Sequence, residues 1–427
     1  MARKMKDSGI EWIGEIPEGW EVAPVRSCFD EVRTKNTDGQ EQNALQFKSG
    51  NIISKANFNA NIDDYVADTI TNYTVVLPDT VMINGLNLNY DFKSLRVALV
   101  KEKGVITSAY LAIFPDRKKI FPQYATYLFK GYETKMAFHN MGAGIRKTLG
   151  YKEFKNQPLL LPSKEEQNKI SAYLDSKCSH IDIMLSKIRS SIEEYKKLKQ
   201  AVITQAVTKG VCGEREMKDS GVDWIGEIPK EWICEKIKYA TSISRGLFNH
   251  RPRNDERYYN GKYPFIQTGD VANATKYIVS YSQTLNELGK AVSKEFPKGT
   301  LTMTIAANVG DVAILNFDAY FPDSVVGFIP NKNIRTLYLF YVFSSMKDEF
   351  TRTAIKSTQL NLNIDRVKET FIPVTLNVNE QCEIENYLES KCAEIDGLIA
   401  KKEQLVKELE SYKKSLIYEV VTGKQEV

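Results

Sequence analysis

Two long stretches of the chain place apolar residues at alternating intervals of three and four positions, a pattern typical of helices with one narrow apolar face. An apolar period near 3.5 residues keeps one seam facing a partner helix. Lysines interrupt this seam at Lys199 and Lys413. We therefore predict two long helices, at residues 165–210 and 379–427, that pair through the seam. The seam positions are Cys178, Ile181, Leu185, Ile188, Ile192, Tyr195 and Val202 in the first helix and Cys392, Ile395, Ile399, Val406, Leu409 and Leu416 in the second.

The segments before each long helix carry the pattern of short strands and helices. Runs of β-branched residues broken by turn residues at 73–84 and 94–114 favour strands. The stretch 122–138 opens with proline and spaces its aromatic residues as a helix does. The second segment repeats this plan, with strands at 299–315 and a helix at 335–350. Both segments are therefore expected to be mixed α/β domains, which makes the fold class α+β.

The chain contains an internal repeat. Met5–Trp20 and Met217–Trp232 are identical at 12 of 16 positions, and Glu166–Asp182 returns in recognisable form as Glu380–Asp396. Chance does not produce two such matches at nearly the same offset, so we predict two copies of one unit related by a pseudo-two-fold axis. The expected division is a first α/β domain at 1–164, a first long helix at 165–210, a second α/β domain at 211–378 and a second long helix at 379–427.

Basic residues are concentrated in the two α/β segments. Between Val22 and Lys164 there are 19 basic and 13 acidic residues, and between Ile233 and Val378 there are 18 and 13. The last 49 residues, in contrast, have 7 basic and 11 acidic residues. Lysine and arginine that neutralise phosphates release condensed counterions, so the basic segments indicate a nucleic-acid partner. A solvated surface of mixed charge is the alternative.

Composition also indicates where the protein acts. The six cysteines include no Cys-x-x-Cys pair, which favours reduced thiols over a disulfide framework. No apolar run approaches the ~18 residues that a membrane-spanning helix needs. The first residues carry basic side chains without a following apolar stretch, unlike a secretory signal. We expect a cytoplasmic protein.

Motifs for catalysis are weak. Asp116, Glu133 and Lys135 fit a loose pattern of metal-dependent nucleases, but Asp116 falls in a turn and Glu133 on a helix with no strand to present it. The stretch 142–150 is glycine-rich, but it resembles a phosphate-binding loop only superficially, since no strand with the required spacing precedes it. The three histidines have no cysteine or carboxylate at zinc-ligand spacing. We therefore expect a chain without catalytic residues, without a metal site and without a cofactor of its own.

The repeated segments resemble a known family. "SGIEWIGEIPEGWE", "LPSKEEQNKISAYLD" and "IEEYKKLKQAVITQAVTKG" are similar to regions of the specificity subunit of type I restriction-modification enzymes, and the resemblance covers the whole chain. It implies two target-recognition domains held apart by two long antiparallel coiled-coil helices. Each domain would read one half of a bipartite, asymmetric sequence in double-stranded DNA.

The same resemblance implies partners and their cofactors. Two methyltransferase subunits, which carry S-adenosylmethionine, would bind the helices and methylate adenine. Restriction subunits that use ATP and Mg²⁺ would join where they exist. The specificity chain itself would catalyse nothing, in agreement with the weak motifs.

DNA contacts are expected from side chains that donate and accept hydrogen bonds at base edges, or that carry charge to phosphates. Arginine and lysine in a flexible glycine-rich loop suit this role best. For each candidate, plain solvated surface or turn chemistry is the alternative. The candidates are Gln46, Lys48, Asn51, Asn87, Asn89, Arg146 and Lys147 in the first domain and Arg245, Arg251, Arg253, Gln267, Thr268, Gln359 and Asn361 in the second.

Two other functions compete with DNA recognition. A coiled-coil scaffold with non-specific DNA-binding modules would show a salt-dominated affinity and little preference among sequences. A self-sufficient nuclease would cleave DNA as the isolated chain and would lose that activity on Asp116→Ala.

Overall fold

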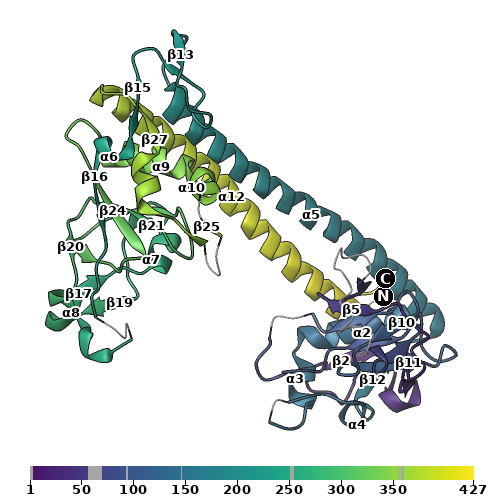
Figure 1. Ribbon diagram of the computed structural model, residues 1–427. Helices are drawn as coiled ribbons and strands as arrows, with labels where there is room; N and C mark the ends of the chain where they lie inside the picture. Colours follow the sequence, from purple (N-terminus) through teal and green to yellow (C-terminus); the bar gives the residue numbers. More distant parts are fainter. Residues whose placement is uncertain are drawn as a thin grey trace. The chain divides into compact units, whose positions relative to one another are not determined.

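The computed structural model describes residues 3–55, 70–92, 95–145, 147–250, 254–353, 355–356 and 360–427. The chain divides into two compact units: unit 1 comprises residues 1–189 and 403–427, and unit 2 comprises residues 190–402. Each unit contains one mixed α/β domain and a length of both long helices (Figure 1). The prediction of a chain that mixes helices and sheets is therefore confirmed.

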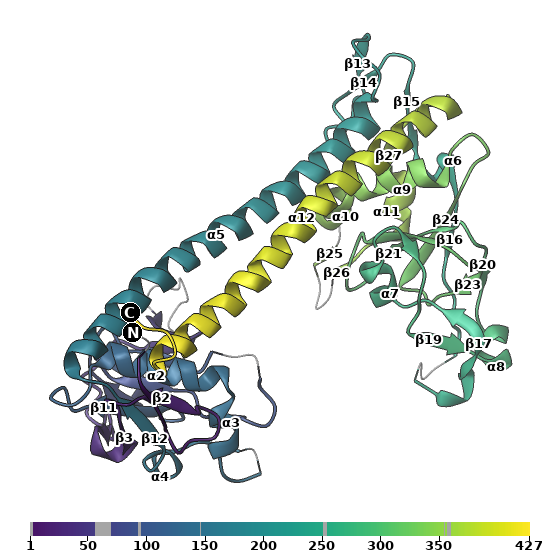
Figure 2. The ribbon, with the colours of Figure 1, turned by 180° about the vertical axis from the view of Figure 1, so that it is seen from behind.

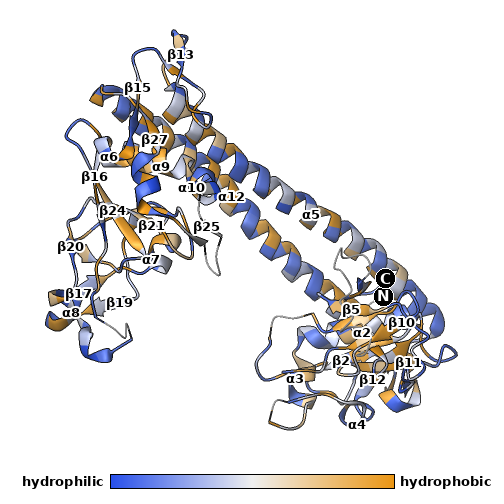
Figure 3. Cartoon of the chain, in the orientation of Figure 1, coloured by the Kyte–Doolittle hydropathy of each residue, from blue (hydrophilic) through white to orange (hydrophobic). Residues whose placement is uncertain are grey.

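The long helices are α5 (Lys164–Lys209) and α12 (Val378–Val421), of 46 and 44 residues. Apolar and polar residues alternate in narrow bands along both (Figure 3). Ser163 Oγ accepts a hydrogen bond from the Glu166 N–H (3.2 Å), and Asn377 Oδ1 caps the first turn of α12 in the same manner (3.1 Å). These caps define where both helices start. The start of α12 lies three residues farther from the preceding proline than the start of α5 does.

The ends of both long helices differ slightly from the prediction. α5 stops before Gly210 and α12 before Thr422, although residues up to 427 were expected to be helical. Gly210 (φ 75°) and Gly423 (φ 71°) adopt the left-handed conformation that commonly terminates helices. The two glycines stand near equivalent positions of the repeat, so both copies end their helix in the same way.

Within unit 1, α5 and α12 run antiparallel. Asp182 Oδ1 contacts Lys413 Nζ at 2.6 Å, and Arg189, one to two turns farther along α5, pairs with Glu410, which lies earlier in α12. The seam residues Cys178, Ile181, Leu185 and Leu416 are buried in the core of this unit, and Val406 and Leu409 pack against it.

Within unit 2, the other parts of the same helices pair in the same sense. Lys199 Nζ contacts Asp396 Oδ2 at 2.6 Å, and Lys402 lies over the Tyr195 ring. This ion pair is the repeat equivalent of the pair in unit 1, with lysine and aspartate exchanged between the helices. The lysines that interrupt the apolar seam are therefore partners for an aspartate on the opposite helix.

Unit 1 contains one four-stranded sheet and four two-stranded pairs, all antiparallel in the described residues. The sheet has the order β4-β11-β8-β9, and the pairs are β1-β2, β3-β12, β5-β6 and β7-β10. The strands are β1 (Met5–Asp7), β2 (Glu15–Pro17), β3 (Glu21–Pro24), β4 (Phe29–Glu31), β5 (Leu45–Lys48), β6 (Asn51–Ser54), β7 (Thr74–Val76), β8 (Val81–Ile83), β9 (Val97–Leu99), β10 (Gly104–Ile106), β11 (Leu111–Pro115) and β12 (Pro158–Leu161); a 3₁₀ turn η1 (Val25–Ser27) follows β3.

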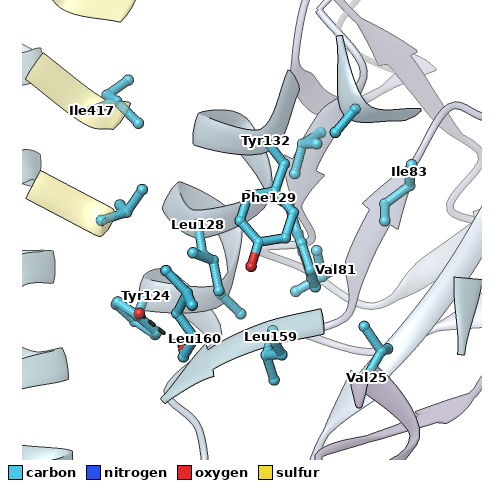
Figure 4. Close-up of a cluster of buried hydrophobic side chains, with 14 of the residues drawn as sticks. Val25, Val81, Ile83, Tyr124, Leu128, Phe129, Tyr132, Leu159, Leu160 and Ile417 are labelled. Atoms are coloured by element: carbon cyan, nitrogen blue, oxygen red, sulfur yellow. Dashed lines mark hydrogen bonds between the residues drawn. The ribbon is translucent and has the colours of Figure 1, made fainter. Parts of the chain in front are cut away.

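Helix α2 (Pro122–Thr134) covers this sheet and supplies much of the core. Proline at its first position suits a helix start, since its missing N–H has no helical partner there. Leu128 and Phe129 are fully buried, and Tyr124 donates from its hydroxyl to the Leu160 carbonyl at 3.0 Å (Figure 4). Ile417 of α12 lies in the same cluster.

The single helix predicted at 122–138 is wrong. α2 ends at Thr134, Met136 adopts a left-handed backbone (φ 53°), and α3 (Ala137–Met141) begins after it. A residue in that conformation cannot continue a right-handed helix, so the apolar periodicity spans two helices. A short helix α4 (Tyr151–Phe154) follows.

Unit 2 has a five-stranded sheet, β16-β24-β21-β22-β18, and a four-stranded sheet, β19-β17-β23-β20. Strands β16, β24 and β21 lie side by side in both views (Figures 1 and 2). The strands are β13 (Met217–Asp219), β14 (Glu227–Pro229), β15 (Ile233–Lys236), β16 (Thr241–Arg245), β17 (Tyr259–Phe265), β18 (Tyr277–Ile278), β19 (Gln283–Leu285), β20 (Glu295–Phe296), β21 (Leu301–Thr304), β22 (Val312–Leu315), β23 (Ala319–Tyr320), β24 (Val325–Pro330), β25 (Ile355–Lys356), β26 (Leu360–Asn361) and β27 (Phe371–Val374).

The helices of unit 2 also depart from the prediction at one place. The helix expected at 335–350 is two helices, which meet at Met346. The helices are α6 (Ile237–Ala240), α7 (Thr268–Asn273), α8 (Glu287–Ala291), α9 (Thr336–Ser345), α10 (Lys347–Thr353) and α11 (Ile364–Glu369), with a 3₁₀ turn η3 (Glu256–Tyr258).

In unit 1 the repeated opening segment is tied to the start of α5. Trp20 is buried, and its Nε1 donates to Glu166 Oε2 at 2.9 Å. Arg3 donates to the other oxygen of the same carboxylate at 2.5 Å. Gln167 accepts from the Phe121 N–H (2.9 Å), which joins α5 to the start of α2.

Unit 2 has the same arrangement in its own residues. Trp232 Nε1 donates to Glu380 Oε2 at 2.9 Å, and Arg215 donates to Glu380 Oε1 at 2.6 Å. Gln381 Oε1 accepts a hydrogen bond from the backbone N–H of Arg335, the residue directly before α9 (2.8 Å). Burial opposes ionisation of Glu380, but hydrogen bonds from Thr375, Arg215 and Trp232 outweigh it and hold the pKa of this carboxyl below its usual value. The repeated Glu-Gln pair thus fixes each α/β domain to its long helix.

Candidate nucleic-acid interface

The first group of predicted DNA contacts lies on the β5–β6 hairpin of unit 1. Its two-residue turn is Ser49-Gly50, both with positive φ (47° and 72°), as expected for a tight hairpin turn. Gln46, Lys48 and Asn51 are all exposed, and Lys48 pairs directly with Asn51. Side chains alternate across a strand, so these three project from one face of the hairpin.

A second group lies on the loop that follows β8. Arg96 is buried, and its guanidinium donates to the carbonyls of Asn84 (2.9 Å), Leu86 (2.9 Å) and Asp91 (2.5 Å). Three carbonyls of one loop thus converge on one cation. Asn87 adopts a left-handed conformation (φ 53°) at the exposed tip of this loop.

The glycine-rich loop lies against this one. Ala143 and Thr148 exchange both backbone hydrogen bonds (3.1 and 2.9 Å), which closes the loop as a small hairpin. The Leu88 N–H donates to the Lys147 carbonyl (3.1 Å), and Asn89 Nδ2 donates to the Ile145 carbonyl (3.1 Å). We call residues 84–92, 142–145 and 147–148 together the two-loop surface.

The structure separates the predicted residues of this surface by role. Asn87 and Lys147 are exposed, as a DNA contact requires. Asn89 is half-buried and its amide supports the Ile145 backbone, so we assign it to holding the loops rather than to contacting DNA. Arg146 lies outside the described residues.

The hairpin and the two-loop surface are neighbours through Leu95. A Cβ atom added at Gly50 would lie 3.0 Å from Leu95 Cβ, so the hairpin turn approaches this residue closely. Leu95 directly precedes Arg96, which holds the loop 84–91. Predicted residues from three separate parts of the sequence therefore lie in one region of unit 1.

A half-buried carboxylate, that of Glu133, contacts the backbone of this region. Glu133 accepts a hydrogen bond from the Arg96 backbone N–H at 2.6 Å. Burial raises the pKa of Glu133 to about 7, against the opposing effects of Arg96, Lys130 and Lys414.

The nuclease hypothesis gains no support from these contacts. Glu133 is engaged with Arg96, Lys135 lies over the Tyr418 ring, and Asp116 forms a turn with its neighbours. Their contacts are with three different parts of unit 1. Within the described part of the chain, no group of three His, Cys, Asp or Glu side chains could hold a metal ion.

In unit 2 the predicted residues are more scattered. Arg245 is exposed at the end of β16 and donates to the Asp323 carbonyl. Gln267 precedes α7 and donates to Gln283 Oε1 at 2.9 Å, while the neighbouring Thr268 is half-buried. Gln267 and Thr268 thus contribute to local structure at the start of α7.

The structure describes little of the remaining predicted residues of unit 2. Arg251, Arg253 and Gln359 lie outside the described residues, and for Asn361 only its place in β26 is described. His250, which precedes Arg251, stacks on the Tyr258 ring at 3.9 Å. A hydrogen bond from Arg257 holds the pKa of Asp255, the partner of His250, well below its usual range.

Sequence reasoning missed two residues of the two-loop surface, Tyr90 and Ile145, and Arg96, which holds one of its loops. Arg96 stands in an apolar run that reads as an ordinary strand, so nothing marked it as the centre of a loop. Tyr90 and Ile145 were passed over because the candidates were chosen for the donors and acceptors of Arg, Lys, Asn and Gln side chains. The signal that was available is their place in loops, where apolar residues are exposed more often than in strands.

Residues 246–408 match the family model described as the type I restriction modification DNA specificity domain. Over 96% of this chain and 95% of its own length, the putative type I restriction enzyme MjaX specificity subunit of Methanocaldococcus jannaschii is 24% identical. The MjaVIII specificity subunit of the same organism is also 24% identical, over 96% of this chain and 93% of its own.

A solved structure supports the fold. A chain from a study of complex assembly and conformational transition of the type I R-M system has a TM-score of 0.71 at 15% identity, covering 96% of this chain and 99% of that one. No helix among the described residues is long and apolar enough to span a membrane. The resemblance inferred from the sequence is confirmed: nearly the whole chain is similar to specificity subunits of type I restriction-modification enzymes, and residues 246–408 match the DNA specificity domain.

Proposed function

We propose that this chain is the DNA-recognition subunit of a type I restriction-modification enzyme and that its two α/β domains each read one half of a bipartite target. The observation that carries the proposal is the similarity of nearly the whole chain to specificity subunits, together with the DNA specificity domain at residues 246–408. Catalysis would belong to partner subunits: a methyltransferase that carries S-adenosylmethionine and, where present, a restriction subunit that uses ATP and Mg²⁺.

The target is proposed to be asymmetric because the two α/β domains differ from each other, although the contacts that anchor them to the long helices are the same. The Trp–Glu–Arg contact that anchors each domain has the same donors and acceptor in both units. The sheets differ: unit 1 has one four-stranded sheet, and unit 2 has a five-stranded and a four-stranded sheet. Different surfaces on equivalent anchors suit two different half-sites, whereas identical surfaces would imply a palindrome.

The spacer between the half-sites is proposed to depend on the paired helices. A helix of 46 residues is roughly 70 Å long at 1.5 Å per residue, which exceeds the ~34 Å of one DNA turn. Residues added to both helices would therefore change the spacer without changing either half-site.

Two methyltransferase subunits are proposed to bind equivalent places on the two units. Leu198 and Tyr412 stand at equivalent repeat positions, one in each unit, and are 48% and 57% exposed on the long helices. Exposed apolar residues at matching places suit two copies of one partner.

Mapping of methylated adenines in the DNA of cells with and without this gene tests the proposed function. We expect deletion to abolish methylation of one asymmetric bipartite motif and the restored gene to return it. A strain that expresses the neighbouring methyltransferase and keeps all its methylated motifs without this chain would reject the proposal.

A further inference from the structure

The two-loop surface exposes apolar side chains at its outermost positions. Ile145 is 94% exposed, Tyr90 is 71% exposed and Phe92 is 57% exposed. Single exposed apolar residues are ordinary on protein surfaces. Three on two adjoining loops, linked by the Asn89–Ile145 hydrogen bond, form a patch of the kind that marks an interaction site.

These side chains are presented by ordered loops. The Ala143–Thr148 backbone pair closes the loop around Ile145, and a Cβ atom at Gly142 would lie only 2.7 Å from Leu88 Cδ1. The two loops are therefore packed together at their bases. Arg96 fastens the other loop from beneath, and burying a cation to do so is costly unless its hydrogen bonds are made.

The surroundings of the patch carry groups that suit DNA. Lys147 is exposed two residues after Ile145, and Lys48 projects from the neighbouring hairpin. Asn87 is exposed on the loop that carries Tyr90. Lysine contacts phosphate and asparagine contacts base edges, while the apolar group that a DNA groove offers is the thymine C5-methyl in the major groove.

We propose that Ile145, with Tyr90 beside it, enters the major groove and reads the first half-site by apolar contact with a thymine methyl group. Arg96 is the positioning residue that holds the loop of Tyr90. This inference rests on the proposed function and adds a mode of recognition to it: specificity comes partly from apolar contact with a base rather than from hydrogen bonds to it.

The test uses the full chain, assembled with its methyltransferase partner, and a duplex that contains the mapped target. Ile145→Ala is expected to weaken binding to this duplex about 5- to 30-fold, while binding to random DNA stays unchanged. The melting temperature is expected to stay unchanged as well, because a side chain 94% exposed contributes little to folding. Leu77→Ala, at an exposed residue before β8 rather than after it, is the matched control and should bind as the wild type does.

Salt dependence separates the apolar contact from phosphate contacts. Lys147→Ala should lower the slope of log affinity against log salt by about one, whereas Ile145→Ala should leave the slope unchanged. A changed slope in Ile145→Ala would overturn the inference, because the contact would then act through charge.

The decisive arm replaces each thymine of the first half-site in turn with deoxyuridine, which lacks only the methyl group. At one position the replacement should weaken DNA binding by the wild type. The same replacement should not further weaken DNA binding by Ile145→Ala, which has already lost the contact with that methyl group. The inference would be overturned if the affinity losses caused by Ile145→Ala and by each deoxyuridine were fully additive. It would also be overturned if no replacement changed the affinity of the wild type. A wild type that prefers no sequence at all would instead reject the proposed function, so the two failures are distinguishable.

Discussion

The tryptophan that anchors each α/β domain permits an internally controlled prediction. Trp20→Phe and Trp232→Phe each remove one indole N–H from a carboxylate while keeping an aromatic ring in the buried site. A hydrogen bond to a charged group contributes roughly 1.5–3 kcal/mol. We expect Trp232→Phe to lose this full amount of stability, because Glu380 is only 11% exposed. Trp20→Phe should lose about 1 kcal/mol, because Glu166 is 25% exposed and therefore better solvated.

Hydrogen exchange followed by mass spectrometry measures each unit separately in the same molecule. A loss of about 2 kcal/mol corresponds to roughly 30-fold faster exchange where local opening limits it. Trp232→Phe should therefore accelerate exchange at the start of α12 and leave the start of α5 unchanged. Trp20→Phe should do the reverse, by a smaller factor.

Acid supplies the control for the charged acceptor. The pKa of Glu380 is lowered in the folded protein, so its stabilisation is present above the usual carboxyl pKa and is lost as pH falls through the folded value. The difference between Trp232→Phe and the wild type should shrink on acidification. Equal exchange in wild type and Trp232→Phe at neutral pH, or a larger effect at Trp20, would refute the reasoning.

Three further predictions concern the region around Arg96 and the helices. Arg96→Met should destabilise unit 1 by about 3–5 kcal/mol in chemical denaturation, because three carbonyls lose their donor, while unit 2 unfolds as before. Since the pKa of Glu133 is raised to about 7, the stability of unit 1 should fall as pH rises from about 4.5 to 7 and then level off, and denaturation of Glu133→Gln should show a flatter profile. Inserting one helical turn into both α5 and α12 should lengthen the spacer of the methylated motif; an unchanged spacer would mean that the helices do not set it.

The long helices were predictable because their signal is local and repeated. A seam of three and four spacing from Cys178 to Val202 outweighs single exceptions such as Lys199. The partner of that lysine, Asp396, is 197 residues away, so sequence spacing alone did not connect them. The offset of the repeat contained the hint, since Asp182 and Lys413 form the same pair.

The two-loop surface was only half predictable. Asparagine in a loop indicates either a DNA contact or a turn, and the choice between Asn87 and Asn89 depends on the position of Ile145, 56 residues beyond Asn89. Arg96 shows the opposite limit: this basic residue, directly before the apolar strand β9, is buried because the carbonyls of a separate loop satisfy it. Such outcomes are set by packing between segments, which local patterns do not report.

The two copies of the repeat do not coincide with the two compact units, because the end of each long helix is buried in the core that the other copy's domain forms. Unit 1 is completed by the end of the second copy: Leu416, Ile417 and Val420 are buried in its core, and Figure 4 shows Ile417 within this cluster. Unit 2 in turn buries Ile203 and Val207 from the first copy. Each copy must therefore keep a helix end that fits the other domain, as in the isologous interface of a two-fold dimer. A substitution in a seam residue alters a contact between copies, and one in an anchor residue alters the contact of a domain with its own long helix. A substitution at the tip of the two-loop surface alters neither core, which leaves the residues that we propose to read DNA free to vary.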